Sequence, residues 1–300
     1  MRTPRATPRL TCCAVAALTP TIDAVVQAPA IAPATLATLA REAGAKAIVP
    51  FGAGATPAYR FPGIGSGTAL IEGARAAQCD LAFVPGDRHL NRVRVVAMDM
   101  DSTLITIECI DEIADMKGIK PEVAAITGSA MRGEIDFAES LQLRVALLTG
   151  LPVAVLDRVY EERLGISAGA VRMLAGFKEA GAITVLVSGG FTFFTERLKA
   201  RLALDVAVAN TLGVADGYLT GTIDGPIVDA RVKAATVRDL KRKHAGSDGL
   251  TVTIGDGAND LPMFAEADVA IAYRAKPVVR AQATHALDYC GLDAALNLFR

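Results

Sequence analysis

Short apolar runs that alternate with helical stretches define the part of the chain that begins at Val93. The run VRVVAM is nearly continuously apolar and ends abruptly at Asp99, which is typical of a parallel strand buried on both faces. Comparable segments follow it. The further runs cover residues 183–187, 206–209, 251–254 and 269–272, and the helical stretches include 170–180 and 232–244. This alternation predicts an α/β fold built on a doubly wound, mostly parallel sheet.

Two segments interrupt this alternation. A βαβ unit needs roughly 30 residues, yet the interval between Asp99 and Ile183 is more than twice as long and much of it has a helical pattern. We therefore expect a helical cap inserted over residues 108–165. The segment GVADGYLTGTIDGPIVD contains alternating residues flanked by Asp216-Gly217 and Asp224-Gly225, which predicts a β-hairpin that projects from the sheet rather than extending it.

The first 90 residues have the pattern of a small α/β region. Leu36, Leu39 and Ala40 have helical spacing within residues 34–43, and residues 45–49 are typical of a short strand. The segment FGAGATPAYRFPGIGSG lacks the lysine of GxxxxGK[ST] and the spacing of GxGxxG, so we interpret it as a connecting loop. The expected organisation is a small α/β region over residues 1–90, a core over 91–107 and 166–300, and the helical cap over 108–165.

No motif in residues 1–90 indicates a ligand. We expect this region to serve packing or dimerisation, the second of which would make the protein a homodimer. The chain begins MRTPRATPRLTCCAVAALTP, with three arginines and no acidic residue before Asp23, as in some targeting segments. Its apolar stretch, residues 12–18, is short and Pro20 follows, so a tail that leads into a first strand fits the pattern as well.

The composition excludes several classes of protein. With 52% hydrophobic and 21% charged residues over 300 positions, the chain is expected to be globular and not disordered. Its net charge of -1 argues against a nucleic-acid binder and favours a small-molecule partner. Despite a mean hydropathy of +0.36, no apolar run approaches the roughly 18–20 residues that span a bilayer, so no membrane association is expected. The 5 cysteines and 3 histidines show neither C-x-x-C nor H-x-x-x-H spacing, and we expect reduced thiols in a cytoplasmic protein.

Four polar clusters stand at the carboxyl ends of predicted strands or in the segments that follow, at the edge where open α/β sheets bind ligands. They are Asp99-Met100-Asp101-Ser102-Thr103, Ser188-Gly189-Gly190, Lys233, and Gly255-Asp256-Gly257-Ala258-Asn259-Asp260. Taken one at a time, these clusters have ordinary explanations, namely helix capping, a strand-to-helix turn, a solvated surface lysine and a capped turn. Taken together, the carboxylates provide hard oxygen ligands for Mg²⁺, while Ser188, glycine amides at a helix N-terminus and Lys233 provide partners for phosphate oxygens. The combination predicts phosphoryl transfer to an aspartate nucleophile, with a metal ion that reduces the repulsion between the two anions.

The order of these motifs resembles the haloacid dehalogenase superfamily. DMDST, SGGFTFF, a single lysine and GDGAND carry the resemblance, which extends from about Val93 to the C-terminus. Within that superfamily, Glu108 in IECIDEIA, Arg144 in AMRGEIDFAESLQLRVALLTGLP, and the segment SGGFT are similar to the phosphoserine phosphatases. The resemblance implies a Rossmann-like core with a cap, and a Mg²⁺-dependent enzyme. Such an enzyme hydrolyses O-phospho-L-serine to L-serine and inorganic phosphate through an aspartyl-phosphate, as the last step of serine biosynthesis.

The resemblance also implies roles for the acidic residues. Asp99 would attack phosphorus, and Asp101 would first protonate the departing serine oxygen and then accept a proton from the hydrolytic water. Mg²⁺ would be held by the side chains of Asp99 and Asp256 and by the backbone carbonyl of Asp101. Asp260 would lie behind these ligands without binding the metal directly.

Further residues would bind the phosphoryl group in the same scheme. Ser188 and the Gly189 amide would hold phosphoryl oxygens, and Lys233 would balance the negative charge of Asp99 and the phosphoryl group. Asn259 would orient the substrate or its phosphate.

Free phosphoserine carries an ammonium and a carboxylate in addition to its phosphate. Glu108 can pair with the ammonium, and Arg144 can bind the carboxylate through two parallel hydrogen bonds. From spacing alone, Glu108 and Arg144 would be interpreted as ordinary charged residues on a helix surface. The family resemblance instead favours a role in substrate binding. We expect Phe137 and Met131 to close an apolar lid that excludes water. Three nearby charges are interpreted as solvated residues of the cap surface: Arg132, Glu134 and Asp136.

Two kinds of alternative remain. The first alternative has the same phosphoryl-transfer chemistry but another substrate: a phosphatase or phosphotransferase that acts on another small phospho-metabolite. Glu108 and Arg144 distinguish this alternative from a phosphoserine phosphatase. The other is a signalling switch that stores an aspartyl-phosphate on a receiver domain. Against the switch stand Asp101, which can activate water two residues after the nucleophile, and the long helical insertion.

Overall fold

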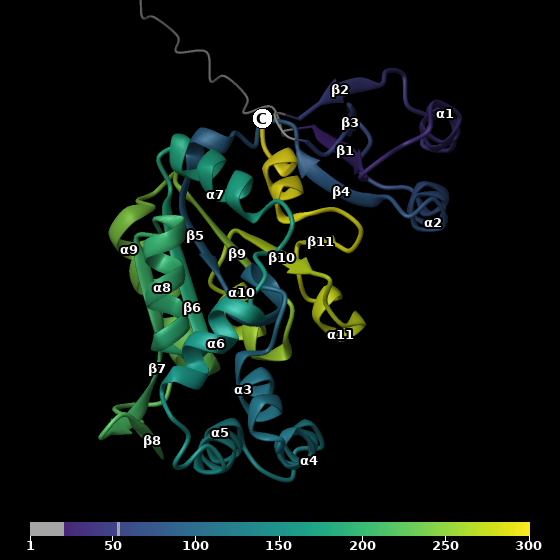
Figure 1. The fold of residues 1–300 in the computed structure, drawn as a ribbon. Helices are drawn as coiled ribbons and strands as arrows, with labels where there is room; N and C mark the ends of the chain where they lie inside the picture. Colours follow the sequence, from purple (N-terminus) through teal and green to yellow (C-terminus); the bar gives the residue numbers. More distant parts are fainter. Residues whose placement is uncertain (1–20, 53–54) are drawn as a thin grey trace, which may run out of the picture.

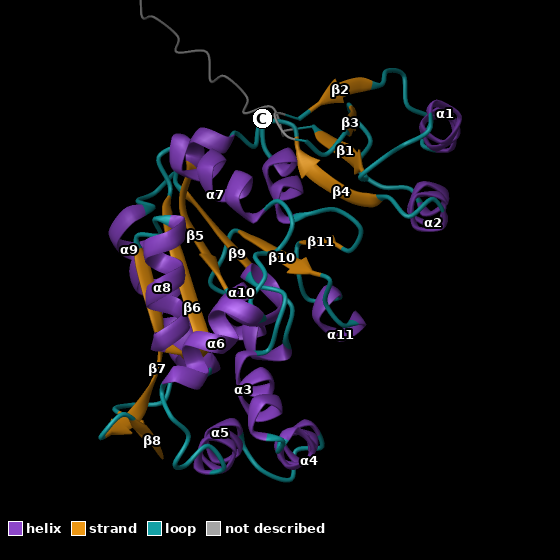
Figure 2. Ribbon diagram, viewed as in Figure 1, coloured by secondary structure: helices purple, strands orange, loops and turns teal. Residues whose placement is uncertain are grey.

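The computed structural model describes residues 21–52 and 55–300. The predictions made for residues 1–20, including the tail or targeting segment, Cys12 and Cys13, lie outside the described residues. The described chain contains a four-stranded sheet of order β2-β3-β1-β4 and a seven-stranded sheet of order β11-β10-β9-β5-β6-β7-β8 (Figures 1 and 2). Within the described ranges no helix is long and apolar enough to cross a membrane.

The smaller sheet is antiparallel and carries two helices. Its elements are β1 (Ile22–Gln27), α1 (Pro33–Glu42), β2 (Val49–Phe51), β3 (Ala58–Phe61), α2 (Thr68–Ala76) and β4 (Asp80–Pro85). Val26, Leu39, Phe61 and Leu70 form part of a buried cluster between the helices and the sheet. The α/β character predicted for this region and the helix predicted over residues 34–43 are confirmed.

Two predictions in this region were wrong. Residues 45–48 are not a strand, because hydrogen bonds from Gly44 N to Arg41 O (3.0 Å) and from Ala45 N to Ala40 O (2.9 Å) close the end of α1, and extended structure begins only at Val49. The glycine-rich segment interpreted as a loop contains β3, which pairs with both β1 and β2. Partners that are distant in the sequence, and not local alternation, make this segment a strand.

The larger sheet confirms the predicted doubly wound, mostly parallel arrangement. Its strands are β5 (Val93–Met98), β6 (Ile183–Phe191), β7 (Val206–Ala215), β8 (Tyr218–Asp224), β9 (Leu250–Gly255), β10 (Val269–Tyr273) and β11 (His285–Leu287). Only the β7–β8 pair is antiparallel among the described strand pairs of this sheet. The strands that follow β5 are added outward on both of its sides, so the strand order reverses at β5. Open α/β sheets bind ligands at this position, beyond the carboxyl ends of the strands.

Helices cover both faces of this sheet. They are α7 (Ala170–Glu179), α8 (Thr192–Leu202), α9 (Ala230–His244), α10 (Leu261–Phe264) and α11 (Pro277–Arg280). Val96 and Met98 of β5 belong to one buried cluster, which includes residues of α7 and α8. Val95 and Ala97 belong to a second cluster, which includes residues of α9, α10 and α11. A strand buried on both faces explains why VRVVAM is apolar at nearly every position.

The long interval after Asp99 is mostly helical. Its helices are α3 (Cys109–Lys117), α4 (Lys120–Met131), α5 (Phe137–Ala146) and α6 (Ala154–Glu162). The Asp136 side chain accepts a hydrogen bond from the Glu139 N–H (2.8 Å) and so caps α5. Within α5, Phe137, Leu141 and Arg144 follow each other at spacings of four and three, which puts them on one face of the helix. Figure 1 shows α3, α4 and α5 beyond the ends of the central strands.

The predicted hairpin is present and is made of β7 and β8. β7 pairs with β6 through Asn210 and the residues before it, and pairs with β8 only from Thr211 onward. The hairpin therefore projects past the parallel part of the sheet, as Figure 1 shows at its lower left. Its outer strand and its turn form hydrogen bonds with the segment between α5 and α6: Gly150 N to Leu219 O (2.9 Å), Leu219 N to Leu151 O (2.8 Å) and Val153 N to Gly217 O (2.9 Å).

Buried polar contacts join the two sheets. The Asp80 carboxylate, at the start of β4, accepts hydrogen bonds from the backbone N–H groups of Asp288, Tyr289 and Cys290 (2.8–3.3 Å). Asp23 of β1 contacts Arg300 at 3.1 Å. Of the cysteines in the described ranges, Cys79, Cys109 and Cys290 are all buried free thiols, as expected.

Candidate active site

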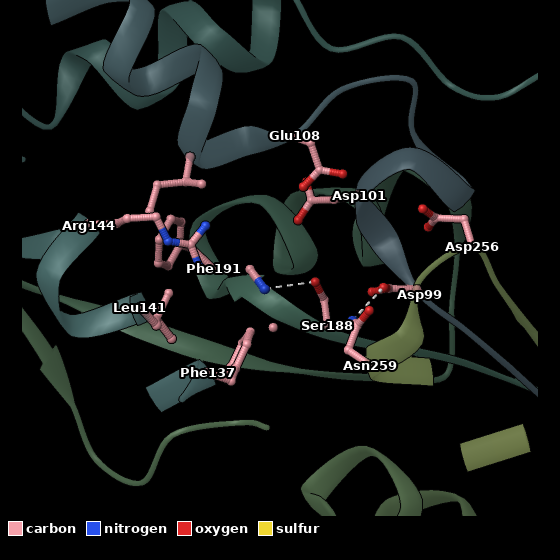
Figure 3. Close-up of a pocket in the computed structure, with 13 residues that line it drawn as sticks. Asp99, Asp101, Glu108, Phe137, Leu141, Arg144, Ser188, Phe191, Asp256 and Asn259 are labelled. Atoms are coloured by element: carbon pink, nitrogen blue, oxygen red, sulfur yellow. Dashed lines mark hydrogen bonds between the residues drawn. The ribbon is translucent and has the colours of Figure 1, made fainter. Parts of the chain in front are cut away.

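A cavity of about 120 Å³ is lined both by the carboxyl ends of the central strands and by residues of the helical insertion (Figure 3). Its lining combines acidic, basic and apolar side chains with glycine backbone. The lining residues are Asp99, Asp101, Glu108, Ile110, Phe137, Leu141, Arg144, Ser188, Gly189, Gly190, Phe191, Asp256 and Asn259. Three of the four predicted polar clusters therefore line one small cavity, together with residues of the helical insertion.

Asp99 and Lys233 form a buried ion pair at the base of this cavity. Lys233 Nζ lies 2.7 Å from Asp99 Oδ2 and 2.9 Å from Asp260 Oδ1. Burial alone would lower the pKa of Lys233, but the charges of Asp99 and Asp260 raise it above its ordinary value, so the ammonium keeps its proton. The interpretation of Lys233 as a solvated surface residue is excluded, because the side chain is only 1% exposed.

Asp101 lies two residues after Asp99 in a bent segment. Ser102 has φ 54°, and this bend lets Asp101 Oδ1 accept a hydrogen bond from the Cys109 N–H at 3.0 Å. Removal from water, followed by the charges of Glu108 and Asp99, raises the pKa of Asp101 to about 8. A carboxyl group with this pKa carries a proton near neutral pH and can donate it.

Asp99, Asp256 and Asp260 form an acidic cluster in which one oxygen of each lies within 4.8 Å of the others. Asp260 is already engaged, because it accepts hydrogen bonds from Lys233 Nζ and from the backbone N–H groups of Asp256 (3.2 Å) and Gly257 (3.1 Å). Asp256 is held by the Thr103 hydroxyl at 2.9 Å. Asp99 and Asp256 line the cavity and Asp260 does not, so the carboxylates that a cation in the cavity would meet are those of Asp99 and Asp256, and this hard-oxygen set fits a small divalent ion.

Ser188 lies in an irregular end of β6. Its side chain is 1% exposed, and its Oγ accepts a hydrogen bond from the Gly190 N–H at 2.9 Å, drawn dashed in Figure 3. Ser188 and the two glycines were expected at a helix N-terminus, but they belong to β6, which continues to Phe191, and α8 begins at Thr192. The strand register changes between Val187 and Phe191, the segment that contains Ser188.

Glu108 and Arg144 line the same cavity and come from the helical insertion. Glu108 Oε1 accepts a hydrogen bond from the Ser102 hydroxyl at 2.6 Å, and burial raises the pKa of Glu108. Arg144 Nε donates to the Ser140 carbonyl at 3.2 Å, and burial lowers the pKa of Arg144. One acid and one base thus lie close to the acidic cluster that contains Asp99.

The apolar part of the cavity differs from the prediction. Phe137 lines the cavity beside Gly189, where an added Cβ would approach Phe137 Cζ to 2.9 Å. Met131 is 68% exposed and is not among the lining residues, so the predicted contribution of this residue to a lid was wrong. Ile110, Leu141 and Phe191 complete the apolar lining, and sequence analysis did not single them out, because nothing local distinguishes them from core residues.

The charges interpreted as solvated cap residues are on the surface. Arg132 and Glu134 form an exposed ion pair at 2.6 Å. Asp136 is also exposed, and in addition it caps α5. None of the three lines the cavity.

Comparisons with known proteins agree with this geometry. The family model for haloacid dehalogenase-like hydrolase matches residues 96–265. A phosphoserine phosphatase of Polaromonas sp. strain JS666 is 49% identical over 219 residues, which cover 71% of this chain and 93% of that protein. A phosphoserine phosphatase of Haemophilus influenzae is 42% identical over 229 residues, covering 76% of this chain and 73% of the relative.

Solved structures give the same result. The crystal structure of a probable phosphoserine phosphatase from Vibrio cholerae in unliganded form has a TM-score of 0.81 at 34% identity, and the match covers 92% of this chain and 85% of that one. A phospho-aspartyl intermediate analogue of phosphoserine phosphatase has a TM-score of 0.63 at 35% identity, covering 69% of this chain and 99% of that one. The chain belongs to the haloacid dehalogenase-like hydrolase family, and these curated relatives within it are phosphoserine phosphatases.

Proposed function

We propose that the protein is a phosphoserine phosphatase, which hydrolyses O-phospho-L-serine to L-serine and inorganic phosphate in the last step of serine biosynthesis. One observation carries the proposal. A single small cavity combines the groups needed for phosphoryl transfer with one acid and one base, Glu108 and Arg144, that match the two charges of the amino-acid part of the substrate. Relatives at 41–49% identity carry the same enzyme name, and one structural relative is a substrate-bound phosphoserine phosphatase complex.

The proposed reaction begins with Asp99. A carboxylate oxygen of Asp99 forms a bond to phosphorus while the bond between phosphorus and the serine oxygen breaks, and Asp101 gives its proton to that oxygen. The raised pKa of Asp101, about 8, supports its role as the proton donor. In the second half of the reaction Asp101 accepts a proton from water, whose oxygen bonds to phosphorus, and phosphate leaves as the Asp99 carboxylate is restored.

Two groups offset the negative charge that accumulates at Asp99. Lys233, at 2.7 Å, is a permanent cation beside the nucleophile. Mg²⁺ would be held by the side chains of Asp99 and Asp256 and by the backbone carbonyl of Asp101, and it would neutralise charge on the phosphoryl oxygens. Ser188, the Gly189 amide and Asn259 would hold and orient the same oxygens. Asn259 Nδ2 lies 3.5 Å from Asp99 Oδ2, close enough to act on the reacting group.

The remaining part of the cavity selects the alcohol. Glu108 would pair with the ammonium of phosphoserine, and Arg144 would bind the carboxylate through two parallel hydrogen bonds. Phe137 would cover the substrate and exclude water. The main rival is a phosphatase or phosphotransferase for another small phospho-metabolite, and it would not need this pair of charges. A receiver-type switch is disfavoured, because the relatives are enzymes and the cavity already contains a proton donor.

The chain would be divided into residues 1–90, a catalytic core over 91–107 and 166–300, and a helical cap over 108–165. The first region would serve packing or dimerisation, so light scattering of the purified protein should report a homodimer if dimerisation is its role. Reduced thiols and the metabolic substrate favour a cytoplasmic location.

Phosphate release from a panel of phosphorylated small molecules, with and without Mg²⁺, tests the proposed function. Phosphoserine should be the preferred substrate, and chelation of Mg²⁺ should remove the activity. Preference for a phosphate ester without an α-amino acid group would refute the assignment of the substrate and leave the phosphatase chemistry intact.

A further inference from the structure

The end of β6 that carries Ser188 leaves the regular strand pairing. β6 and β7 are paired at Val187–Val208 and again at Phe191–Asn210. Three residues of β6, 188–190, therefore stand opposite one residue of β7, and they form a bulge toward the cavity. The close approach is visible at Gly190, where an added Cβ would lie 2.8 Å from Asp101 Oδ2.

A bulge of this kind leaves backbone carbonyls without ladder partners. Asn210 of β7 supplies the missing partner. Its Nδ2 donates to the Gly189 carbonyl at 2.8 Å and to the Gly190 carbonyl at 3.3 Å. Its Oδ1 accepts a hydrogen bond from the Val228 N–H at 2.7 Å. The side chain is 1% exposed and both ends of its carboxamide are engaged.

The hydrogen bond from Asn210 to the Gly189 carbonyl fixes the orientation of the peptide group between Gly189 and Gly190, and both of these residues line the cavity. In a trans peptide the carbonyl of one residue and the N–H of the next point in opposite directions, and the described residues contain no cis peptide. When the Gly189 carbonyl points to Asn210, the Gly190 N–H must therefore point away from Asn210. That N–H donates to Ser188 Oγ at 2.9 Å.

We infer that Asn210 is a positioning residue that acts through this peptide plane to orient the Ser188 hydroxyl toward the phosphoryl group. The inference deepens the proposed function, on which it rests for the role of Ser188. Asn210 does not line the cavity. It also joins the phosphate-binding bulge to the segment before α9, the helix that carries Lys233.

The test is the variant Asn210→Asp, which keeps the shape and the acceptor for Val228 but replaces the donor by an oxygen that repels both carbonyls. We expect kcat/KM to fall about tenfold to a hundredfold, because small displacements of positioned groups have effects of this size. The loss should be similar for phosphoserine and p-nitrophenyl phosphate, which share only the phosphate, and the inhibition constant of inorganic phosphate should rise. Thr211→Val is the matched control, since Thr211 is the exposed next residue and its hydroxyl contacts that of Thr192 at 3.3 Å, not the bulge of β6.

A double-mutant cycle with Ser188→Ala separates positioning from a general effect on the fold. If Asn210 acts through Ser188, the double variant should lose little more activity than Ser188→Ala alone. Losses that multiply, or an unchanged kcat/KM in a folded Asn210 variant, would overturn the inference. If Asn210→Asp does not fold, Asn210→Ala removes the same donor without adding a charge and takes its place in the cycle.

Assays with both substrates also distinguish a failure of this inference from a failure of the proposed function. If the wild-type protein hydrolyses p-nitrophenyl phosphate but not phosphoserine, the proposed substrate is refuted, whereas the cycle with p-nitrophenyl phosphate still decides the role of Asn210.

Discussion

Replacing Arg144 by alanine should separate recognition of the amino acid from the chemistry at phosphorus. Arg144 lines the cavity, and of its nitrogen atoms only Nε has a hydrogen bond within the described residues, to the Ser140 carbonyl. The terminal nitrogens are thus available to a ligand carboxylate. Arg144→Ala removes them and leaves Asp99, Lys233 and Asp256 untouched.

The size of the effect follows from the environment of the guanidinium. Removing one partner of a buried, hydrogen-bonded charge pair costs about 2–5 kcal/mol. Arg144 is only partly buried, so we take about 3 kcal/mol, which is roughly a 150-fold loss of kcat/KM for phosphoserine. p-Nitrophenyl phosphate has no carboxylate, and its kcat/KM should stay within about threefold of the wild-type value. Arg144→Lys should recover little, because an ammonium cannot make two parallel hydrogen bonds.

Steady-state kinetics with both substrates at saturating Mg²⁺ provide the assay. Arg163→Ala is a suitable control, since Arg163 belongs to the same helical insertion but pairs with Glu112 and Asp115 outside the cavity and is 44% exposed. This control should behave as the wild type toward both substrates. Equal losses on both substrates in Arg144→Ala would refute the reasoning and assign Arg144 to the phosphate or to the fold.

Further predictions concern the nucleophile, the junction of the two sheets and the dependence of stability on pH. Asp99→Asn should abolish turnover and covalent capture of phosphate, as measured by phosphate release and by mass spectrometry of acid-quenched protein; robust hydrolysis by this variant would exclude Asp99 as the nucleophile. Asp80→Ala should lower the free energy of unfolding by about 3 kcal/mol in urea titrations, because it leaves buried N–H groups of residues 288–290 without acceptors; an unchanged midpoint would show that this junction contributes nothing. Burial, reinforced by the charge of Arg88, lowers the pKa of His285 to about 3. The unfolded chain therefore binds a proton below about pH 6.5 that the folded protein does not, and stability should fall as the pH decreases, by about 2 kcal/mol between pH 7 and pH 5. His285→Gln should lack this part of the pH dependence, and identical pH profiles for variant and wild type would contradict it.

Patterns that depend on burial along one strand were predictable from the sequence. The five predicted strands of the larger sheet lie within β5, β6, β7, β9 and β10, because a parallel strand covered on both faces must be apolar at successive positions. The location of the candidate site was predictable from the same apolar runs, because its polar clusters lie at or after the ends of these strands. β3, β4 and β11 were not predicted; β3 and β11 are short, and all three pair with strands elsewhere in the chain.

Features that depend on contacts between distant segments were not predictable. Lys233 has the same local pattern as Lys241 and Lys243, and only the position of α9 against β5 and β6 buries it beside Asp99. Asn210 lies in a stretch without any recognised motif, and its role depends on a bulge in a neighbouring strand. Met131 is apolar like Phe137, but it occupies the end of α4, away from the cavity.

The hydrogen bonds between β8 and the segment after α5 restrict how a substrate can enter. Opening the active site by swinging the whole insertion outward would break the three bonds that join residues 150–153 to Leu219 and Gly217. Because β8 pairs with β7, the insertion is connected at this point, through β8, to the strand that carries Asn210, and a rigid outward swing of the whole insertion would also strain the hairpin. A rearrangement limited to side chains that line the cavity, such as Phe137, would leave these three bonds intact.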